Sequence, residues 1–149
     1  MKLLTLFFIT TIFIYANQND IAIIKSDFKK IEQRVKRQKL RVRKINIDDL
    51  QDIYIYKNSA NKVVKIKAEG GEDSYHKGEY YFKNGKLFFS YVVSNARDCQ
   101  VSLRSYFSNG KLILKKLSHK GCKLKPQYPP FIKDYKDLLE VFKYEEYGE

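Results

Sequence analysis

The sequence predicts an α+β fold: an N-terminal amphipathic helix packed on an antiparallel β-meander of about six strands, with a short C-terminal helix. Three observations support this prediction. Apolar residues recur every three or four positions after residue 20 and again after residue 134, which indicates helices. Between them, β-branched and aromatic runs alternate with short turns. The stretch at 80–89 also recurs 25 positions later at 105–114, each copy with an Asn-Gly turn between two apolar runs.

The first 16 residues have the layout of a secretory signal peptide. Lys2 gives a positive start, residues 3–15 are almost wholly apolar, and Ala16 is a small residue followed by polar ones. A membrane anchor is the alternative, but the apolar run is shorter than the about 20 residues that a membrane-spanning helix needs. We therefore predict cleavage after Ala16 and export to the periplasm or out of the cell. The mature chain, 17–149, is expected to form one domain without a transmembrane segment.

The first helix is predicted from about residue 20 to Gln38, and either Asn19 or Asp20 can cap its start by accepting a backbone N–H. Its apolar stripe has the spacing of one helical face and consists of Ile21, Ile24, Phe28, Ile31 and Val35. We expect this stripe to pack on the sheet. The alternative is that the basic amphipathic helix lies on a membrane surface. Residues 40–47 lose the helical period and are predicted to be extended.

The middle of the chain is a series of strand signals separated by turn residues. The predicted strands are 53–56, 63–66, 74–83, 86–93, 99–108 and 111–118. Turns are expected at 57–61 and 94–98, and Gly70-Gly71 breaks the pattern between two of the strands. Because short turns join consecutive strands, neighbours in sequence should pair in an antiparallel sheet.

Two of the turns are specified most strongly. Asn84-Gly85 and Asn109-Gly110 each lie between apolar runs, and a type I′ turn requires positive φ at both of its central residues. Asn and Gly tolerate that conformation best. We therefore predict a tight two-residue hairpin at each site.

The register of these hairpins decides which side chains share a face of the sheet. A regular register pairs Phe82 with Leu87 and Tyr80 with Phe89 in the first hairpin. The face that carries Phe82 and Phe107 is the more continuously apolar, so we expect it to lie under the first helix. The other face is then predicted to expose an aromatic patch, unless the C-terminal segment covers it. The members of that patch are Tyr81, Phe88, Tyr106 and Ile113.

The C-terminal segment is predicted in two parts. Three prolines at 126–130 exclude helix there and favour an extended crossing. Beyond them, Asp134 can cap a helix, and the apolar residues that follow have helical spacing up to Phe142. We predict a short helix at about 133–146.

The chain has two cysteines, Cys99 and Cys122. In an exported protein, two cysteines in a small domain usually pair. Folding the chain about Asn109-Gly110 brings them to within two residues of direct opposition, and a bulge would close the gap. We predict a Cys99–Cys122 disulfide; the alternative is two free, buried thiols.

The net charge of +12 is unevenly distributed. Residues 25–44 hold ten basic side chains and two acidic ones, and no acid occurs between Asp98 and Asp134. Such asymmetry favours an anionic partner, although a solvated surface is the alternative. Export disfavours nucleic acid as that partner. On the first helix, the candidate binding residues are Lys29, Lys30, Arg34, Lys36 and Arg37.

No catalytic, metal or cofactor motif stands out. His76 and His119 are far apart in sequence, and two cysteines with two distant histidines make no zinc signature. No Gly-rich loop opens a helix, and no nucleophile elbow is present. These observations favour a protein that is not an enzyme and needs no cofactor.

The repeated hairpin resembles that of a family of small, exported bacterial proteins whose function is uncharacterised. In that family a helix precedes strands with a Lys-Ile segment, a Gly, and two copies of a Tyr-Tyr-Phe-x-Asn-Gly-Lys-Leu hairpin. The matching stretches here are 31–35, 65–71, 78–91 and 103–114. The resemblance implies export and a helix-plus-meander fold, and it implies no activity. The two cysteines and the long tail depart from the pattern.

Two functional hypotheses follow. The first is a non-enzymatic periplasmic or secreted binding module for a protein or an anionic envelope component, which would use the basic helix or an exposed sheet face. The alternative is an inhibitor or a structural protein of the cell envelope. An enzyme is retained only as a background case.

Overall fold

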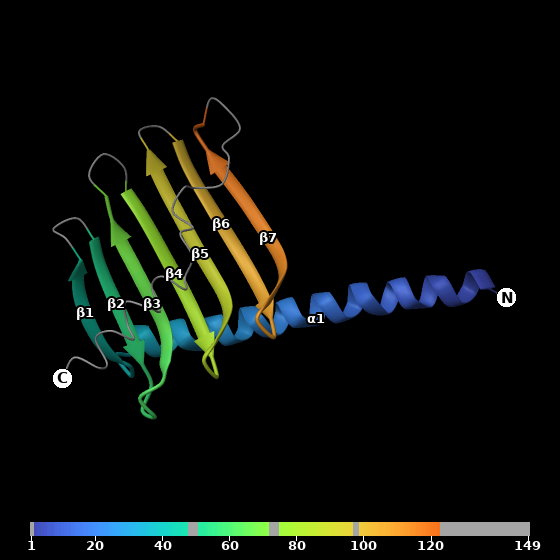
Figure 1. Ribbon diagram of the computed structural model, residues 1–149, viewed down its shortest axis with the longest axis horizontal. Coiled ribbons are helices and arrows are strands. Elements are labelled where there is room, and N and C mark those ends of the chain that lie inside the picture. The colour runs from blue at the N-terminus through green and yellow to red at the C-terminus, as the bar shows by residue number, and fades with distance from the viewer. Residues whose placement is uncertain (1, 48–50, 72–74, 97–98, 123–149) are drawn as a thin grey trace.

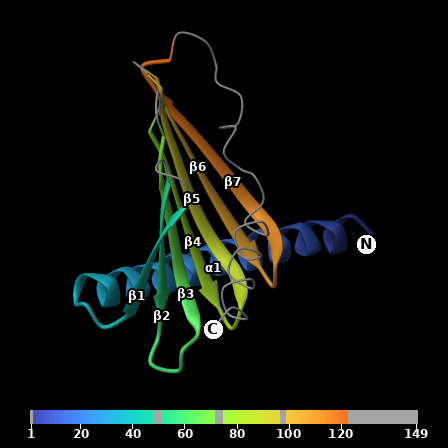
Figure 2. The same ribbon diagram turned by 60° about the vertical axis from the view of Figure 1, so that its left-hand side comes forward.

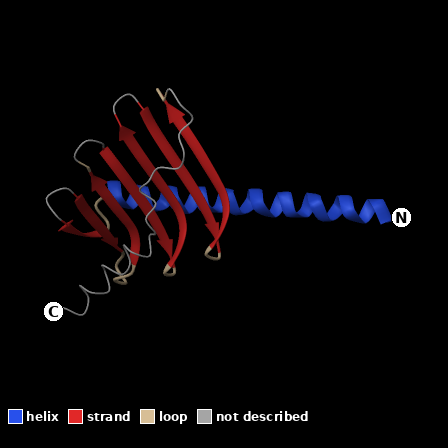
Figure 3. Cartoon of the chain, turned by 45° about the horizontal axis from the view of Figure 1, so that its top comes forward, coloured by secondary structure: helices blue, strands red, loops and turns tan. Residues whose placement is uncertain are grey.

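The computed structural model describes residues 2–47, 51–71, 75–96 and 99–122. Within them, one helix precedes a seven-stranded sheet whose strands lie in chain order, each antiparallel to the next (Figures 1 and 3). The elements are α1 (Lys2–Lys36), β1 (Arg41–Ile47), β2 (Gln51–Lys57), β3 (Val63–Gly70), β4 (Tyr75–Lys83), β5 (Lys86–Ala96), β6 (Cys99–Ser108) and β7 (Lys111–Lys120). The predicted meander is confirmed. Its seventh strand is β1, the stretch that was predicted to be extended.

The helix α1 crosses one face of the sheet, and its N-terminal part extends past β7 (Figures 1 and 2). It runs without interruption through Ala16 and Asp20, so the predicted start and cap near residue 20 are wrong for this chain. No Gly or Pro lies between residues 2 and 36 to break the helix. In the part of the chain that is described, no helix is both long enough and apolar enough to span a membrane.

The C-terminal end of α1 is closed by a Schellman motif. The amide of Lys39 donates to the carbonyl of Arg34 at 2.9 Å, and the amide of Gln38 donates to that of Val35 at 3.0 Å. Gln38 adopts the left-handed conformation, with φ of 54°. The chain then reverses, and Leu40 is buried at the start of the sheet.

Both Asn-Gly turns have the predicted geometry. Asn84 and Gly85 have φ of 53° and 73°, and Asn109 and Gly110 have φ of 52° and 78°. Positive φ at both central residues is the type I′ turn, whose twist matches that of the flanking strands. The sequence therefore determines these two turns locally.

A β-bulge follows each turn at this end of the sheet. In the first Asn-Gly hairpin, Phe82 pairs with Leu87, but Tyr81 pairs with Phe89, which leaves Phe88 as the extra residue. The hairpin of β6 and β7 has the same irregularity, with Ile113 as the extra residue, and that of β2 and β3 has it at Val64. All three bulged residues belong to or pack against the apolar cluster that contacts α1.

The bulges overturn the predicted face assignment. Phe89 lies opposite Tyr81 rather than Tyr80. The face of the sheet that α1 covers, the helix-side face, therefore carries more aromatic rings than the other face. The helix-side cluster consists of Ile24, Ile31, Leu40, Val64, Tyr81, Phe88, Phe89 and Tyr106. The predicted exposed patch is therefore wrong: Tyr81 is 0% exposed, Phe88 8% and Tyr106 5%, and Ile113 packs partly buried on the same cluster. The predicted apolar stripe of the helix is confirmed, because its five members belong to or pack against this cluster.

The opposite face of the sheet carries a second buried cluster. It includes Phe82 and Leu87, which were expected under α1, and Phe107 packs against it. The remaining members are Ile53, Ile55, Ile66, Ala68, Tyr80 and Val92. The predicted proline-containing crossing at 126–130 and the helix at 133–146 lie outside the described residues.

The predicted disulfide between Cys99 and Cys122 is confirmed, with Cα atoms 4.4 Å apart. The bulge at Ile113 shifts β7 by one residue, so that Gln100 pairs with Lys120. That shift removes half of the two-residue offset that a regular hairpin would leave. The bond closes the open end of the β6–β7 hairpin, opposite its Asn-Gly turn.

Candidate functional site

Lys65 is the one charged residue among those described whose side chain is buried, with 3% of its surface exposed. It lies on β3 between its register partners Tyr56 of β2 and Tyr81 of β4, on the face that α1 covers. Its ammonium nitrogen lies 5.5 Å and 5.0 Å from the centroids of those two rings. Two aromatic faces therefore flank the charge, an arrangement that favours a cation.

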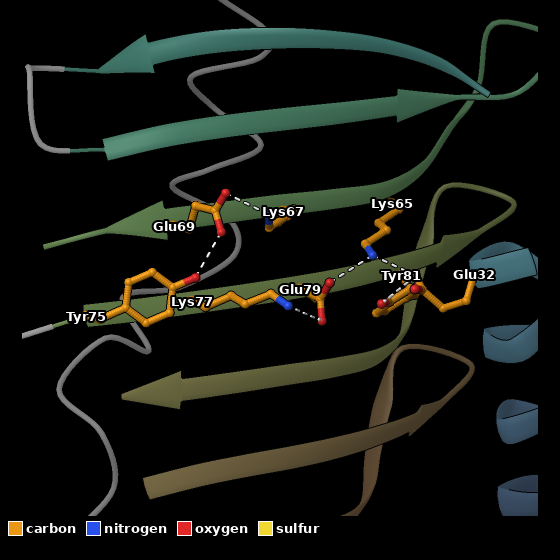
Figure 4. A network of polar contacts seen from close by, with 8 residues as sticks. All are labelled: Glu32, Lys65, Lys67, Glu69, Tyr75, Lys77, Glu79 and Tyr81. Atoms are coloured by element: carbon orange, nitrogen blue, oxygen red, sulfur yellow. Dashed lines mark hydrogen bonds and ion pairs between the residues drawn. The ribbon is translucent and has the colours of Figure 1, made fainter. Parts of the chain in front are cut away.

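Two carboxylates complete the surroundings of Lys65. Its Nζ lies 2.6 Å from Glu32 Oε1 of α1 and 2.9 Å from Glu79 Oε1 of β4. The hydroxyl of Tyr81 donates to the same Glu32 oxygen at 2.9 Å. Helix and sheet are thus joined by a compact ionic cluster beside the aromatic core (Figure 4).

The electrostatics of this cluster indicate a structural role. Burial alone would lower the pKa of Lys65, but the hydrogen bonds and charges of Glu32 and Glu79 outweigh it and raise that pKa. Burial, followed by the two nearby glutamates, also raises the pKa of Tyr81. Both groups keep their protons at neutral pH. Lys65 is consequently an ammonium ion, unsuited to act as a nucleophile or a base.

Charged residues continue along the same face, away from α1. Glu79 also pairs with Lys77 at 3.3 Å. Further along, Glu69 binds Lys67 at 2.6 Å and accepts a hydrogen bond from the Tyr75 hydroxyl at 2.9 Å (Figure 4). Successive register partners form a polar row across all seven strands: Lys44, Tyr54, Lys67, Glu79, Tyr91, Arg104 and Lys116. The helix-side face is therefore aromatic under α1 and ionic beside it.

A pocket of about 380 Å³ lies where α1 meets this polar row. The helix contributes Lys25, Phe28 and Lys29, whose spacing of three and four residues places them on one helical face. The sheet contributes Glu79 of β4, Phe89 and Tyr91 of β5, and Arg104 and Tyr106 of β6. This is the size of a small-molecule site.

The register explains how the sheet residues of the pocket come together. Phe89 pairs with Tyr106 in one rung, and Tyr91 pairs with Arg104 in the next rung on the same face. The Arg104 guanidinium lies 5.0 Å from the centroid of the Tyr91 ring, and Phe28 lies 5.0 Å from Phe89 between ring centroids. The pocket therefore has an aromatic floor with cations beside it.

The charges around the pocket are three cations and one carboxylate. Lys25, Lys29 and Arg104 are exposed, and within the described residues neither lysine has an ion-pair partner. The carboxylate of Glu79 already contacts Lys65 and Lys77. The pocket thus offers cationic groups to an anion and aromatic surface to an apolar group.

A second pocket, of about 220 Å³, lies on the other side of α1 beside the turns. Lys30 and Arg34 line it together with Asn58 and Asn84. Asp27 also lines it and binds Lys83 at 2.6 Å and Lys30 at 3.6 Å. Lys62 and Lys83 line it as well, so four basic residues surround this one carboxylate, which pairs with two of them.

The structure separates the predicted binding residues into groups. Lys29 and Tyr106 line the first pocket, and Lys30, Arg34 and Phe88 line the second. Lys36 and Arg37 are exposed at the end of α1, while Tyr81 and Ile113 belong to the packing under the helix. Sequence reasoning missed Lys25, Glu79, Tyr91 and Arg104. The basic run at 25–44 signalled the first. The bulge in β5 puts Glu79 on the same face as Tyr91 and Arg104.

The two histidines lie apart in the sheet. His76 lies on β4 and His119 on β7, with two strands between them. Within the residues described, no three His, Cys, Asp or Glu side chains lie close enough together to hold a metal ion. No protein-family model, curated protein or solved structure matches this chain. The resemblance to the exported family therefore remains a prediction.

Proposed function

We propose that this chain is an exported, non-enzymatic binding module that holds an anionic component of the cell envelope. The observation that carries the proposal is the cation surface formed by Lys25 and Lys29 of α1 and Arg104 of β6 around one pocket. All three residues follow the predicted cleavage site. The disulfide, of a kind that persists in oxidising compartments, and the predicted leader support export.

The net charge of the chain alone does not explain this choice of site. Most acidic residues on the helix-side face are engaged by lysines of the sheet, as Glu79 and Glu69 are. Lys25 and Lys29 make no such pair with any described residue. Because these two lysines and Arg104 converge on one pocket, we expect the attraction of an anion to be strongest there.

Vesicle co-sedimentation tests the proposal. The chain should bind vesicles that contain phosphatidylglycerol, and salt should weaken that binding. The triple variant Lys25→Gln, Lys29→Gln and Arg104→Gln should bind roughly a hundredfold more weakly, because each basic residue near an anionic surface contributes about 1 kcal/mol. Purely zwitterionic vesicles measure any contribution of the apolar leader, which all variants share.

The matched control is Lys86→Gln, Lys111→Gln and Lys120→Gln, which removes the same charge from exposed positions away from the pocket. The control should retain most of the binding. Equal weakening by the two triple variants would mean that only net charge matters. Binding that is indifferent to phosphatidylglycerol and to salt would contradict the proposal and leave an envelope protein or a target enzyme as the partner class.

A further inference from the structure

The pocket beside α1 has a feature that binding to a charged surface does not need: a floor of aromatic rings. Phe89 and Tyr106 are buried, and their ring centroids lie 5.1 Å apart. Phe28 of α1 and Tyr91 of the polar row also line the pocket. About 380 Å³ lies above these rings, which is in the range of sites that enclose a small molecule.

The charged groups stand on two sides of this floor. Lys25 and Lys29 line it from α1, and Arg104 lines it from β6. The cation–π contact between the Arg104 guanidinium and the Tyr91 ring holds this charge beside the aromatic surface. Glu79 is the acid that faces the pocket, and its two oxygens contact Lys65 at 2.9 Å and Lys77 at 3.3 Å. Its charge is therefore offset within the sheet.

We propose that this pocket binds one small amphiphilic anion, a compact carboxylate, sulfonate or phosphate group joined to an apolar body. The anionic group would lie between Lys25, Lys29 and Arg104. The apolar body would lie on Phe28, Phe89 and Tyr106. The inference rests on the proposed function for its cations, and adds the class of ligand and its orientation.

Two simpler ligands fit the pocket less well. A polyanion without an apolar part would use the cations but leave the aromatic floor in water. A neutral apolar molecule would cover the floor but leave two lysines and an arginine without a counter-ion. Only a ligand with both parts matches the two kinds of surface at once. Such a small ligand also loses little conformational freedom when it binds.

Fluorescence titration of the full chain with two related probes tests this inference. Anilinonaphthalene sulfonate carries an anion on an apolar body, and phenyl-naphthylamine is the same ring system without the sulfonate. We expect one sulfonate-probe site per chain, bound at least tenfold more tightly than the neutral probe, because only the sulfonate can accept charge-assisted hydrogen bonds from the three cations. Methanesulfonate carries the anion without the aromatic body, so at the concentration of the sulfonate probe it should not displace that probe.

Variants separate the two parts of the pocket. The triple Lys25→Gln, Lys29→Gln and Arg104→Gln variant should lose tenfold or more of the affinity for the sulfonate probe and little for the neutral one. Tyr91→Ala should weaken the binding of both probes, whereas Tyr91→Phe should bind both probes as tightly as the parent does. The control triple at Lys86, Lys111 and Lys120 should behave as the parent. Circular dichroism melting of each variant shows whether it is folded, and the single change Lys29→Gln serves if the triple is not.

The outcomes also separate this inference from the proposed function. Equal affinity for the two probes, or sulfonate binding that survives loss of the three cations, would overturn the amphiphile site. If vesicle binding still depended on those cations, the proposed function would stand without it. If neither vesicle binding nor probe binding depended on the three cations, the proposed function and the amphiphile site would both be overturned.

Discussion

The two Asn-Gly hairpins have nearly the same sequence and the same turn, yet they differ in surroundings. Leu87 of the first is 6% exposed, whereas Leu112, its counterpart in the second, is 46% exposed. The first hairpin joins β4 to β5 in the middle of the sheet, and the second joins β6 to the edge strand β7. The repeated motif thus sets the local backbone, while position in the sheet sets how much packing stabilises it.

The edge hairpin has a compensating constraint that the central one lacks. Cys99 and Cys122 close the end of β6 and β7 that is opposite the turn. Little of β7 is buried, so packing holds it weakly. We infer that packing secures the first hairpin and the disulfide secures the second.

The largest expected difference is in the free energy of unfolding of two leucine variants. Leu87→Ala should lose about 2–5 kcal/mol, as truncations of buried leucine do. Leu112→Ala should lose less than about 1 kcal/mol, because much of that side chain is already in water. Urea unfolding with the disulfide intact measures both. Equal losses would contradict the difference between the hairpins.

Removal of the disulfide should affect the second hairpin. Closing a loop across the 23 positions between the cysteines stabilises by about 3 kcal/mol in the chain-entropy account. Cys99→Ser should lower the free energy of unfolding by about that amount under oxidising conditions and show almost no difference from the parent in reductant. Hydrogen exchange should show β7 losing more protection than β4. Uniform loss across the sheet would mean that the bond does not act locally.

The turns themselves should respond alike. A side chain at Gly85 or Gly110 would meet no atom within 4 Å, so its cost comes from positive φ alone. Gly85→Ala and Gly110→Ala should each lose roughly 1–2 kcal/mol in chemical denaturation. A clear difference between the two losses in free energy of unfolding would show that these turns differ in more than their surroundings. Values within about 0.5 kcal/mol of the parent would contradict the type I′ geometry.

Alkaline pH should weaken the first hairpin through its buried tyrosines. Burial raises the pKa of Tyr80 to about 12 and also raises that of Tyr81. A raised folded pKa contributes stability that is complete below the unfolded value, about 10, and is lost as pH rises through the folded value. Unfolding at pH 11 should show a loss of about 1 kcal/mol from Tyr80 alone. Tyr80→Phe should reduce the pH dependence above pH 10, and an unchanged profile would contradict its burial.

Local signals in the sequence were enough for much of the fold. Asn84-Gly85 and Asn109-Gly110 specify their turns, the stripe through Ile24 and Ile31 specifies the buried face of α1, and the position of the cysteines around the second turn predicts the disulfide. Each of these rests on neighbours in sequence or on one hairpin.

The bulges were not predictable in the same way. The runs Leu87-Phe88-Phe89 and Leu112-Ile113-Leu114 are apolar throughout, so alternation does not choose between a regular and a bulged register. That choice decides which face α1 covers. It also puts Glu79 on the same face as Tyr91 and Arg104, so the lining of the pocket could not be predicted until the register was known.

The register under α1 is therefore the central claim, and aromatic nuclear Overhauser contacts from the Phe28 ring test it most directly. The structure places this ring 5.0 Å from the rings of both Tyr81 and Phe89. We predict strong contacts from Phe28 to these two rings. Contacts from Phe28 to Phe82 and Leu87 instead would place the other face under the helix and would contradict the bulged register, the pocket and the function proposed for it.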